Sequence, residues 1–267
     1  MTTTFTAAYR GGSGPPLVLL HGFTDTWRTW ELVLPRLERH HDVLAPTLPG
    51  HAGGPALPAE VTGRLLPDAV EAAMDAAGLA TAHIAGNSLG GYVALQLAAR
   101  GRARSVVAFA PAGGWTPGED WARRMLDGFA DLQAQARAAA PHAAAITGTP
   151  EGRRRATRSI VVDPVHMPAE LIAHQMLGVT RCDVAPMVEC ALREGYRLDA
   201  EAIGCPVRIV WGTRDALLPW PAAAVRYRTG LLPAADWVEL DDVGHCPQLD
   251  APLEAAELIL GFTGAGG

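Results

Sequence analysis

The chain has 267 residues, of which 49% are hydrophobic and 19% charged, so it can bury a sizeable core as one large domain or two small ones. A formal net charge of −6 leaves no excess of positive charge to bind nucleic acid or anionic lipid. All 22 basic residues are arginines, which excludes chemistry that needs a lysine, such as Schiff-base formation.

The cysteines and the first residues of the sequence favour a cytoplasmic location. Four cysteines form no C-x-x-C pair and no zinc-type spacing with histidine, so we expect reduced thiols and leave a Cys182–Cys190 disulfide open. The first residues lack the pattern of a signal peptide, and no apolar run reaches the roughly 18 residues that cross a bilayer. We expect a cytoplasmic protein without nucleic-acid or membrane partners, either monomer or dimer.

Short apolar runs alternate with longer helical patterns along the chain. The runs cover residues 17–20, 42–45, 82–85, 105–110, 206–211 and 236–240. Each predicts a strand buried on both faces, as in a parallel sheet. The helical patterns cover residues 27–39, 65–77, 91–100, 221–229 and 252–261. This alternation predicts an α/β fold with a mostly parallel central sheet and helices on both of its faces.

Residues 115–198 interrupt this alternation. The segment is rich in alanine and arginine, is broken by prolines, and contains no convincing strand. It predicts several short helices inserted between two strands, above the carboxyl ends of the sheet. We therefore expect a core formed by residues 1–114 and 199–267, with residues 115–198 as a helical cap, or lid, over the site.

The segment Gly86-Asn87-Ser88-Leu89-Gly90 has the G-x-S-x-G pattern of a nucleophile elbow. It lies between a predicted strand and a predicted helix, as that motif requires. The turn leaves no room for side chains at positions 86 and 90, and the positive end of the following helix points at developing negative charge. None of the other serines, Ser13, Ser105 and Ser159, has this context.

A serine hydroxyl needs a base to take its proton, and histidine has a suitable pKa. His245 follows the last predicted strand, at the sheet edge where the elbow emerges. Asp215 lies four residues beyond the strand 206–211 and is expected to orient that imidazole. Asp241 and Asp242 are alternatives, but they are too near His245 along the chain to reach it easily.

The segment His21-Gly22-Phe23 follows the first predicted strand of the sheet. Its glycine lets the chain bend so that the next N–H group points inward. The backbone N–H groups of Phe23 and Leu89 are expected to form an oxyanion hole.

Together these segments resemble the α/β-hydrolase family, in particular its serine-nucleophile, esterase-like members with a helical cap. The match runs in order over nearly the whole chain. Its motifs are His21-Gly22-Phe23, Leu48-Pro49-Gly50-His51, Gly86-Asn87-Ser88-Leu89-Gly90-Gly91, Trp211-Gly212-Thr213-Arg214-Asp215 and Gly244-His245-Cys246-Pro247. The resemblance implies the fold, a triad of Ser88, Asp215 and His245, and no metal or organic cofactor.

Some positions depart from the family pattern. Thr47 stands where an aspartate is usual before the P-G-H segment, and Asp250 stands where glutamate is common. Dehalogenases and epoxide hydrolases of the family carry aspartate at the position of Ser88, which speaks against both activities. Carbon–carbon bond hydrolases of ring-cleavage products share the G-N-S-x-G-G elbow, but usually have tryptophan where this chain has Cys246 and a longer oxyanion loop.

We expect the enzyme to cleave a carboxylic ester or related acyl bond, a small to medium apolar ester or lactone, through an acyl-enzyme. The cap should roof an apolar pocket. Its candidate lining residues are Phe23, Trp27 and Leu89 near the elbow, and Trp115, Trp121, Met125, Phe129, Met167, Met176 and Met187 in the insertion. Carbon–carbon bond hydrolysis, a ligand receptor with low turnover, and a lyase or perhydrolase on the same fold stay open as alternatives.

Overall fold

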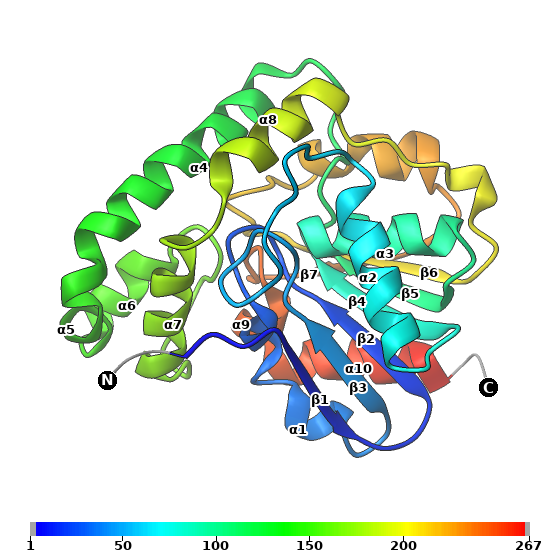
Figure 1. Cartoon of the computed structure of the whole chain (residues 1–267), viewed down its shortest axis with the longest axis horizontal. Helices are drawn as coiled ribbons and strands as arrows, with labels where there is room; N and C mark the ends of the chain where they lie inside the picture. The colour runs from blue at the N-terminus through cyan, green and yellow to red at the C-terminus, as the bar shows by residue number, and fades with distance from the viewer. Residues whose placement is uncertain (1–3, 265–267) are drawn as a thin grey trace.

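The computed structural model describes residues 4–264, and its centre is a seven-stranded sheet (Figure 1). The strands are β1 (Ala8–Gly12), β2 (Pro16–Leu20), β3 (Asp42–Pro46), β4 (Ala82–Asn87), β5 (Ala103–Phe109), β6 (Val207–Gly212) and β7 (Asp236–Leu240). They lie in the order β1-β3-β2-β4-β5-β6-β7, and every pairing is parallel except that of β1 with β3. The predicted fold class is confirmed.

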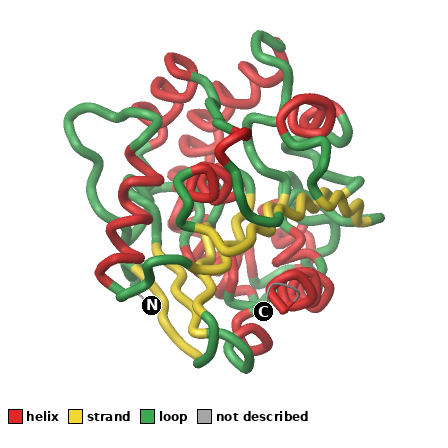
Figure 2. The backbone as a smooth tube through the Cα atoms, turned by 90° about the vertical axis from the view of Figure 1, so that its right-hand side faces the viewer, coloured by secondary structure: helices red, strands yellow, loops and turns green. Residues whose placement is uncertain are grey.

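Helices cover both faces of the sheet, as Figure 2 shows above and below the yellow strands. One face packs against α2 (Leu65–Ala76) and α3 (Leu89–Ala99), around Val93, Leu95 and Leu97. The opposite face packs against a 3-10 turn and two helices. These are η1 (Trp27–Trp30), α1 (Leu34–Leu37) and α10 (Pro252–Thr263). Because both faces are covered, all six residues of β4 are buried.

The two edge strands differ from the sequence prediction. The strand β1 was not predicted, because Gly11 and Gly12 are residues typical of a turn, and its exposed and half-buried residues alternate. The strand β7 was predicted at its observed position, but it is largely exposed or half-buried rather than buried on both faces. Among the strands of residues 4–264, none pairs with its outer edge.

Two predicted helices are also corrected. The pattern over 27–39 forms the short turn η1 and the four-residue helix α1, which has Pro35 in its first turn. The pattern over 221–229 forms a 3-10 turn, Ala222–Ala224, and a wide helical turn, Tyr227–Leu231. Neither segment is a continuous α-helix. Helices α2, α3 and α10 match their predicted positions to within two residues at each end.

The chain between β5 and β6 forms an arch of helices beside the sheet (Figure 1). These are α4 (Asp120–Ala139), α5 (Ala143–Thr147), α6 (Pro150–Thr157), α7 (Ala169–Val179) and α8 (Val184–Glu194). None of the residues 110–206, all of which the structure describes, belongs to a strand. Leu126 and Phe129 of α4 pack with Val184 and Val188 of α8, and partly buried Phe23 joins this cluster from the loop after β2.

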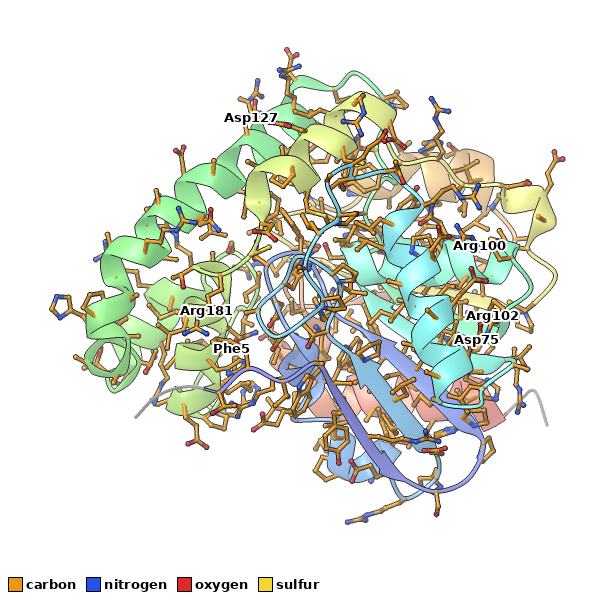
Figure 3. All side chains as sticks on the ribbon, viewed as in Figure 1. Phe5, Asp75, Arg100, Arg102, Asp127 and Arg181 are labelled. Atoms are coloured by element: carbon orange, nitrogen blue, oxygen red, sulfur yellow. The ribbon has the colours of Figure 1, made fainter. Side chains whose placement is uncertain are left out.

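Side-chain contacts tie the segments together around the periphery. The guanidinium of Arg181 lies 4.9 Å from the centre of the Phe5 ring, which joins the end of α7 to the chain before β1 (Figure 3). Arg102 binds Asp75 across 2.5 Å, and this pair joins the chain before β5 to α2 (Figure 3).

All four cysteines are free, so the disulfide left open above is not formed. Over residues 4–264, no helix combines the length and the apolar character needed to cross a bilayer.

Candidate active site

The turn between β4 and α3 carries Ser88 in a strained backbone conformation, with φ 55° and ψ −116°. The flanking glycines explain how the chain tolerates it. A Cβ atom on Gly86 would lie 2.3 Å from the carbonyl oxygen of Gly90, and one on Gly90 would lie 2.2 Å from that of Leu20. Only glycine fits at both places. The turn therefore presents Ser88 at the N-terminus of α3, as the motif predicts.

Asp215 and His245 meet at the carboxyl ends of β6 and β7. His245 Nδ1 lies 2.7 Å from Asp215 Oδ2, and both side chains are almost fully buried. The other carboxylate oxygen accepts the backbone N–H groups of Leu217, at 2.9 Å, and Leu218, at 2.7 Å. A carboxylate so fixed holds the imidazole in one orientation, with the proton on Nδ1. His245 Nε2 is buried and has no hydrogen-bond partner among the described residues.

Asn87 connects the turn to the histidine loop, a role that the sequence analysis missed. Its Nδ2 donates to the carbonyl oxygen of His245 at 2.9 Å and to that of Phe109 at 3.2 Å. Its Oδ1 accepts from Cys246 Sγ and Gln248 Nε2, each at 3.2 Å. The residue before Ser88 thus binds His245 and two residues that follow it. Asn87 is the only asparagine of the chain, and its place in the elbow was the available signal.

The loop after β2 lies against the elbow. A Cβ atom on Gly22 would be 3.4 Å from Cβ of Ser88 and 3.3 Å from Oδ1 of Asn87. Within residues 4–264, the N–H groups of Phe23 and Leu89 have no hydrogen-bond partner, since neither occurs among the backbone or side-chain bonds. Both residues line the same pocket as Ser88. The two N–H groups are therefore available to an incoming group.

A largely apolar pocket opens over Ser88. Residues of the sheet edge and of the inserted helices line it together. They include Phe23, Ser88, Leu89, Leu217 and Leu218 from the first set, and Trp115, Met125, Leu126, Phe129, Met187 and Val188 from the second. Six of the predicted lining residues are in this set: Phe23, Leu89, Trp115, Met125, Phe129 and Met187.

The other predicted lining residues lie elsewhere. Trp27 stacks on Tyr9 at 5.0 Å and packs on the opposite face of the sheet, because the chain turns away after the loop. Trp121 does not line the pocket either, and its ring packs edge-on against that of Trp115, with centroids 5.7 Å apart. Met167 and Met176 belong to a separate apolar cluster with Leu249. Among the described residues, no group of three His, Cys, Asp or Glu side chains could hold a metal ion.

A sequence model of the alpha/beta hydrolase family matches residues 17–258. The chain belongs to the alpha/beta hydrolase family. This alpha/beta hydrolase is 35% identical over 214 residues to an epoxide hydrolase of Mycobacterium tuberculosis, which covers 74% of this chain and 93% of the relative. It is 31% identical over 276 residues to a pimeloyl-(acyl-carrier protein) methyl ester esterase of Aromatoleum aromaticum. This match covers 92% of this chain and 96% of the relative. The family and these relatives together show that the chain is a hydrolytic enzyme.

Solved structures share the fold of this alpha/beta hydrolase. The enol-lactonase of Burkholderia xenovorans superposes with a TM-score of 0.73 at 22% identity, covering 96% of this chain and 95% of that one. At this level of identity the similarity concerns the fold alone.

Two further histidines of this alpha/beta hydrolase, His21 and His51, lie in and beside the loop after β2. His21 Nε2 accepts the N–H of Leu48 at 2.9 Å, and its Nδ1 lies 2.8 Å from the carbonyl oxygen of Gly22. Burial and the neighbouring His51 lower the pKa of His21 well below its usual value. Burial also lowers the pKa of His51 to about 4. Both rings are therefore neutral near pH 7 and shape the loop without adding charge to the site.

Proposed function

We propose that the protein hydrolyses carboxylic esters or related acyl bonds, with Ser88 as nucleophile, His245 as general base and Asp215 as the group that orients the base. One observation carries the proposal. Asp215 holds His245 Nδ1 at 2.7 Å, while Nε2 of the same ring has no partner in the described structure. An imidazole with one nitrogen fixed and the other free can take a proton from a nearby serine hydroxyl.

The reaction proceeds in two halves. Ser88 Oγ attacks the carbonyl carbon of the ester and gives its proton to His245 Nε2. The N–H groups of Phe23 and Leu89 stabilise the negative oxygen of the tetrahedral intermediate. His245 then protonates the leaving alcohol, which leaves an acyl-Ser88 ester. A water molecule that gives its proton to the same imidazole releases the acid and restores the serine.

The inserted helices serve as the cap of this site, over a core of residues 1–114 and 199–267. The pocket supports this division, because residues of both parts line it. Its apolar lining suits a small to medium ester or lactone. The four free cysteines are compatible with the cytoplasmic location expected from the sequence.

The two relatives favour different bonds, one an ester and the other an epoxide. The chemistry of Ser88 distinguishes them. Attack of a serine oxygen on an epoxide carbon would form an ether, which has no carbonyl group for water to attack, and the enzyme would stay alkylated. Attack on an ester forms a new ester that water can cleave. A serine nucleophile therefore supports acyl transfer.

Turnover of p-nitrophenyl butyrate by the wild type and by Ser88→Ala tests the proposal. We expect fast release by the wild type and a loss of at least about 1,000-fold in the variant. A fluorophosphonate probe, located by mass spectrometry, should label Ser88 alone. Styrene oxide should not be turned over. Ester turnover that survives in Ser88→Ala, or epoxide opening by the wild type, would contradict the mechanism.

A further inference from the structure

The pocket continues beyond the proposed reaction centre along one face of α3. The face consists of Ser88, Leu89, Tyr92, Val93 and Gln96, all of which line the pocket. At a rise of 1.5 Å per residue, Gln96 lies about 12 Å along the helix axis from Ser88. A substrate arm that starts at Ser88 can therefore follow two turns of α3. The remote end is the one at Gln96, and Thr62, Gly63, Leu66, Cys190 and Tyr196 line the same pocket.

This remote end contains a carbonyl oxygen without a partner. The hydroxyl of Tyr92 donates its single proton to the carbonyl oxygen of Arg197, at 2.7 Å. Toward Gln96 it can then only accept, so the group that faces it, 3.0 Å away, is the Gln96 amide nitrogen. This pairing orients the amide. Gln96 Oε1 is left buried, with no hydrogen-bond partner among the described residues. A buried acceptor without a partner carries a desolvation cost, which a hydrogen bond from a ligand's donor group would remove.

Tyr196 adds a second neutral polar group at the same end. Its ring packs edge-on against Tyr92 and Trp115, with centroids 5.0 and 5.1 Å away. Burial raises the pKa of its hydroxyl, which therefore stays protonated. Among the described residues that line the pocket, none carries a charged side chain. An ionised group would lose its hydration there without gaining a counter-charge, whereas a neutral donor would be bound.

We propose that Gln96 selects substrates whose acyl arm carries a neutral hydrogen-bond donor, such as a hydroxyl or a primary amide, at the end remote from the ester. This inference rests on the proposed function, because it places the acyl carbon at Ser88. The acyl arm is the part concerned, since it stays bonded to Ser88 while the alcohol leaves. Gln96 Oε1 accepts the hydrogen bond of the arm, and Tyr196 lines the same pocket.

Three p-nitrophenyl esters of equal chain length test this inference: the octanoate, its analogue with a terminal hydroxyl group, and its analogue with a terminal carboxylate. For the wild type we expect kcat/KM of the hydroxyl ester to exceed that of the octanoate by about tenfold, the effect of one buried hydrogen bond. The carboxylate ester should be the poorest of the three. In Gln96→Met, which keeps the length of the side chain but not the acceptor, the ratio of hydroxyl ester to octanoate should fall to about one.

The matched control is Gln135→Met, the same change on the exposed face of α4, which should keep the wild-type ratio. Circular dichroism and the thermal midpoint establish that both variants are folded. A ratio that is equal in the wild type and Gln96→Met, or a preference for the carboxylate ester, would overturn the role of Gln96. If no ester is cleaved in a Ser88-dependent way, p-nitrophenyl acetate included, the proposed function itself fails, and the inference with it.

Discussion

The side-chain amide of Asn87 donates a hydrogen bond to the carbonyl oxygen of His245 across 2.9 Å. This bond joins the turn that carries the proposed nucleophile to the loop that carries the proposed base. Asp215 holds the ring of His245, and Asn87 holds its backbone, so both ends of the residue are fixed before a substrate binds. Such preorganisation lowers the cost of reaching the transition state.

Replacing Asn87 with alanine should therefore affect both rate and stability. We expect kcat for p-nitrophenyl butyrate to fall by about 100-fold with little change in KM, because the imidazole is misplaced while the pocket is kept. The free energy of unfolding should fall by about 1–3 kcal/mol, since the buried carbonyl of His245 and the amide of Gln248 lose a partner. Steady-state kinetics and urea unfolding measure the two effects.

Gln248→Ala is the control for this prediction. It also removes a hydrogen bond to Asn87, but Gln248 makes none to His245 in the described structure. We expect a similar loss of stability and a much smaller loss of kcat. Equal losses of kcat in the two variants would mean that Asn87 acts only through general stability.

Asp215→Asn should reduce kcat by about 10,000-fold while KM changes little. The amide can donate to His245 Nδ1, which favours the tautomer with the proton on Nε2. That nitrogen then cannot accept the proton of Ser88. Asp242→Asn is the control, because Asp242 is exposed and pairs with Arg214 instead. A larger loss from Asp242→Asn than from Asp215→Asn would identify Asp242 as the acid of the triad.

Two glycine-to-alanine changes should have opposite effects on stability. In Gly90→Ala the new Cβ atom would lie 2.2 Å from the carbonyl oxygen of Leu20, so the elbow must shift and activity should be lost. Gly128 lies within α4, and a Cβ atom there meets nothing within 4 Å. Gly128→Ala should raise the free energy of unfolding by about 0.5–1 kcal/mol. Urea unfolding and ester kinetics on both variants check this, and a stable, active Gly90→Ala would refute the steric account of the elbow.

Stability should decrease as the pH falls, because burial lowers the pKa of several histidines, including His21. Burial is the main cause that lowers the pKa of His51 and of His174 from 6.5 to about 4. Between these values the unfolded chain binds more protons than the folded one. The free energy of unfolding therefore rises with pH up to about 6.5, by at most about 1.4 kcal/mol per pH unit for each histidine.

His174→Gln tests this pH dependence. The variant keeps a polar group near Thr26 but does not titrate, so the slope of stability against pH should be smaller than in the wild type. His142→Gln, at an exposed position, is the matched control and should keep the wild-type slope. Urea unfolding at several pH values between about 4 and 6.5 gives the slopes. Identical slopes for the wild type and His174→Gln would exclude His174 as a source of the effect.

The features that could be predicted from the sequence are those that depend on residues close together along the chain. The buried strands were found from their apolar runs, and Ser88, Asp215 and His245 were found from their positions just beyond strand ends. The structure brings Asp215 and His245 into contact and places Ser88 on the expected turn. Their catalytic roles stay predictions. The edge strand β1 escaped because its glycines resemble a turn and its residues alternate in exposure.

The direction in which a side chain points was harder to predict than the helix, strand or loop to which its residue belongs. Trp27 follows the His21-Gly22-Phe23 loop by only four residues, yet its ring packs on the far face of the sheet. Thr24, with φ 68°, lies in the turn that redirects the chain, and nothing in its residue type announces this conformation. The bonds of Asn87 to residues near 245 span 158 positions or more, so no local pattern could reveal them.

The inserted helices leave the sheet after β5 and return to it at β6, and these two strands are adjacent, with Phe109 opposite Val210. The two points of attachment are therefore neighbours on one rigid platform. A segment anchored in this way can change in length or sequence while the register of the strands beneath it stays the same. Exchanging residues 115–198 as a block is thus a direct route to new substrate ranges, since Asp215, His245 and Ser88 all lie outside the exchanged block.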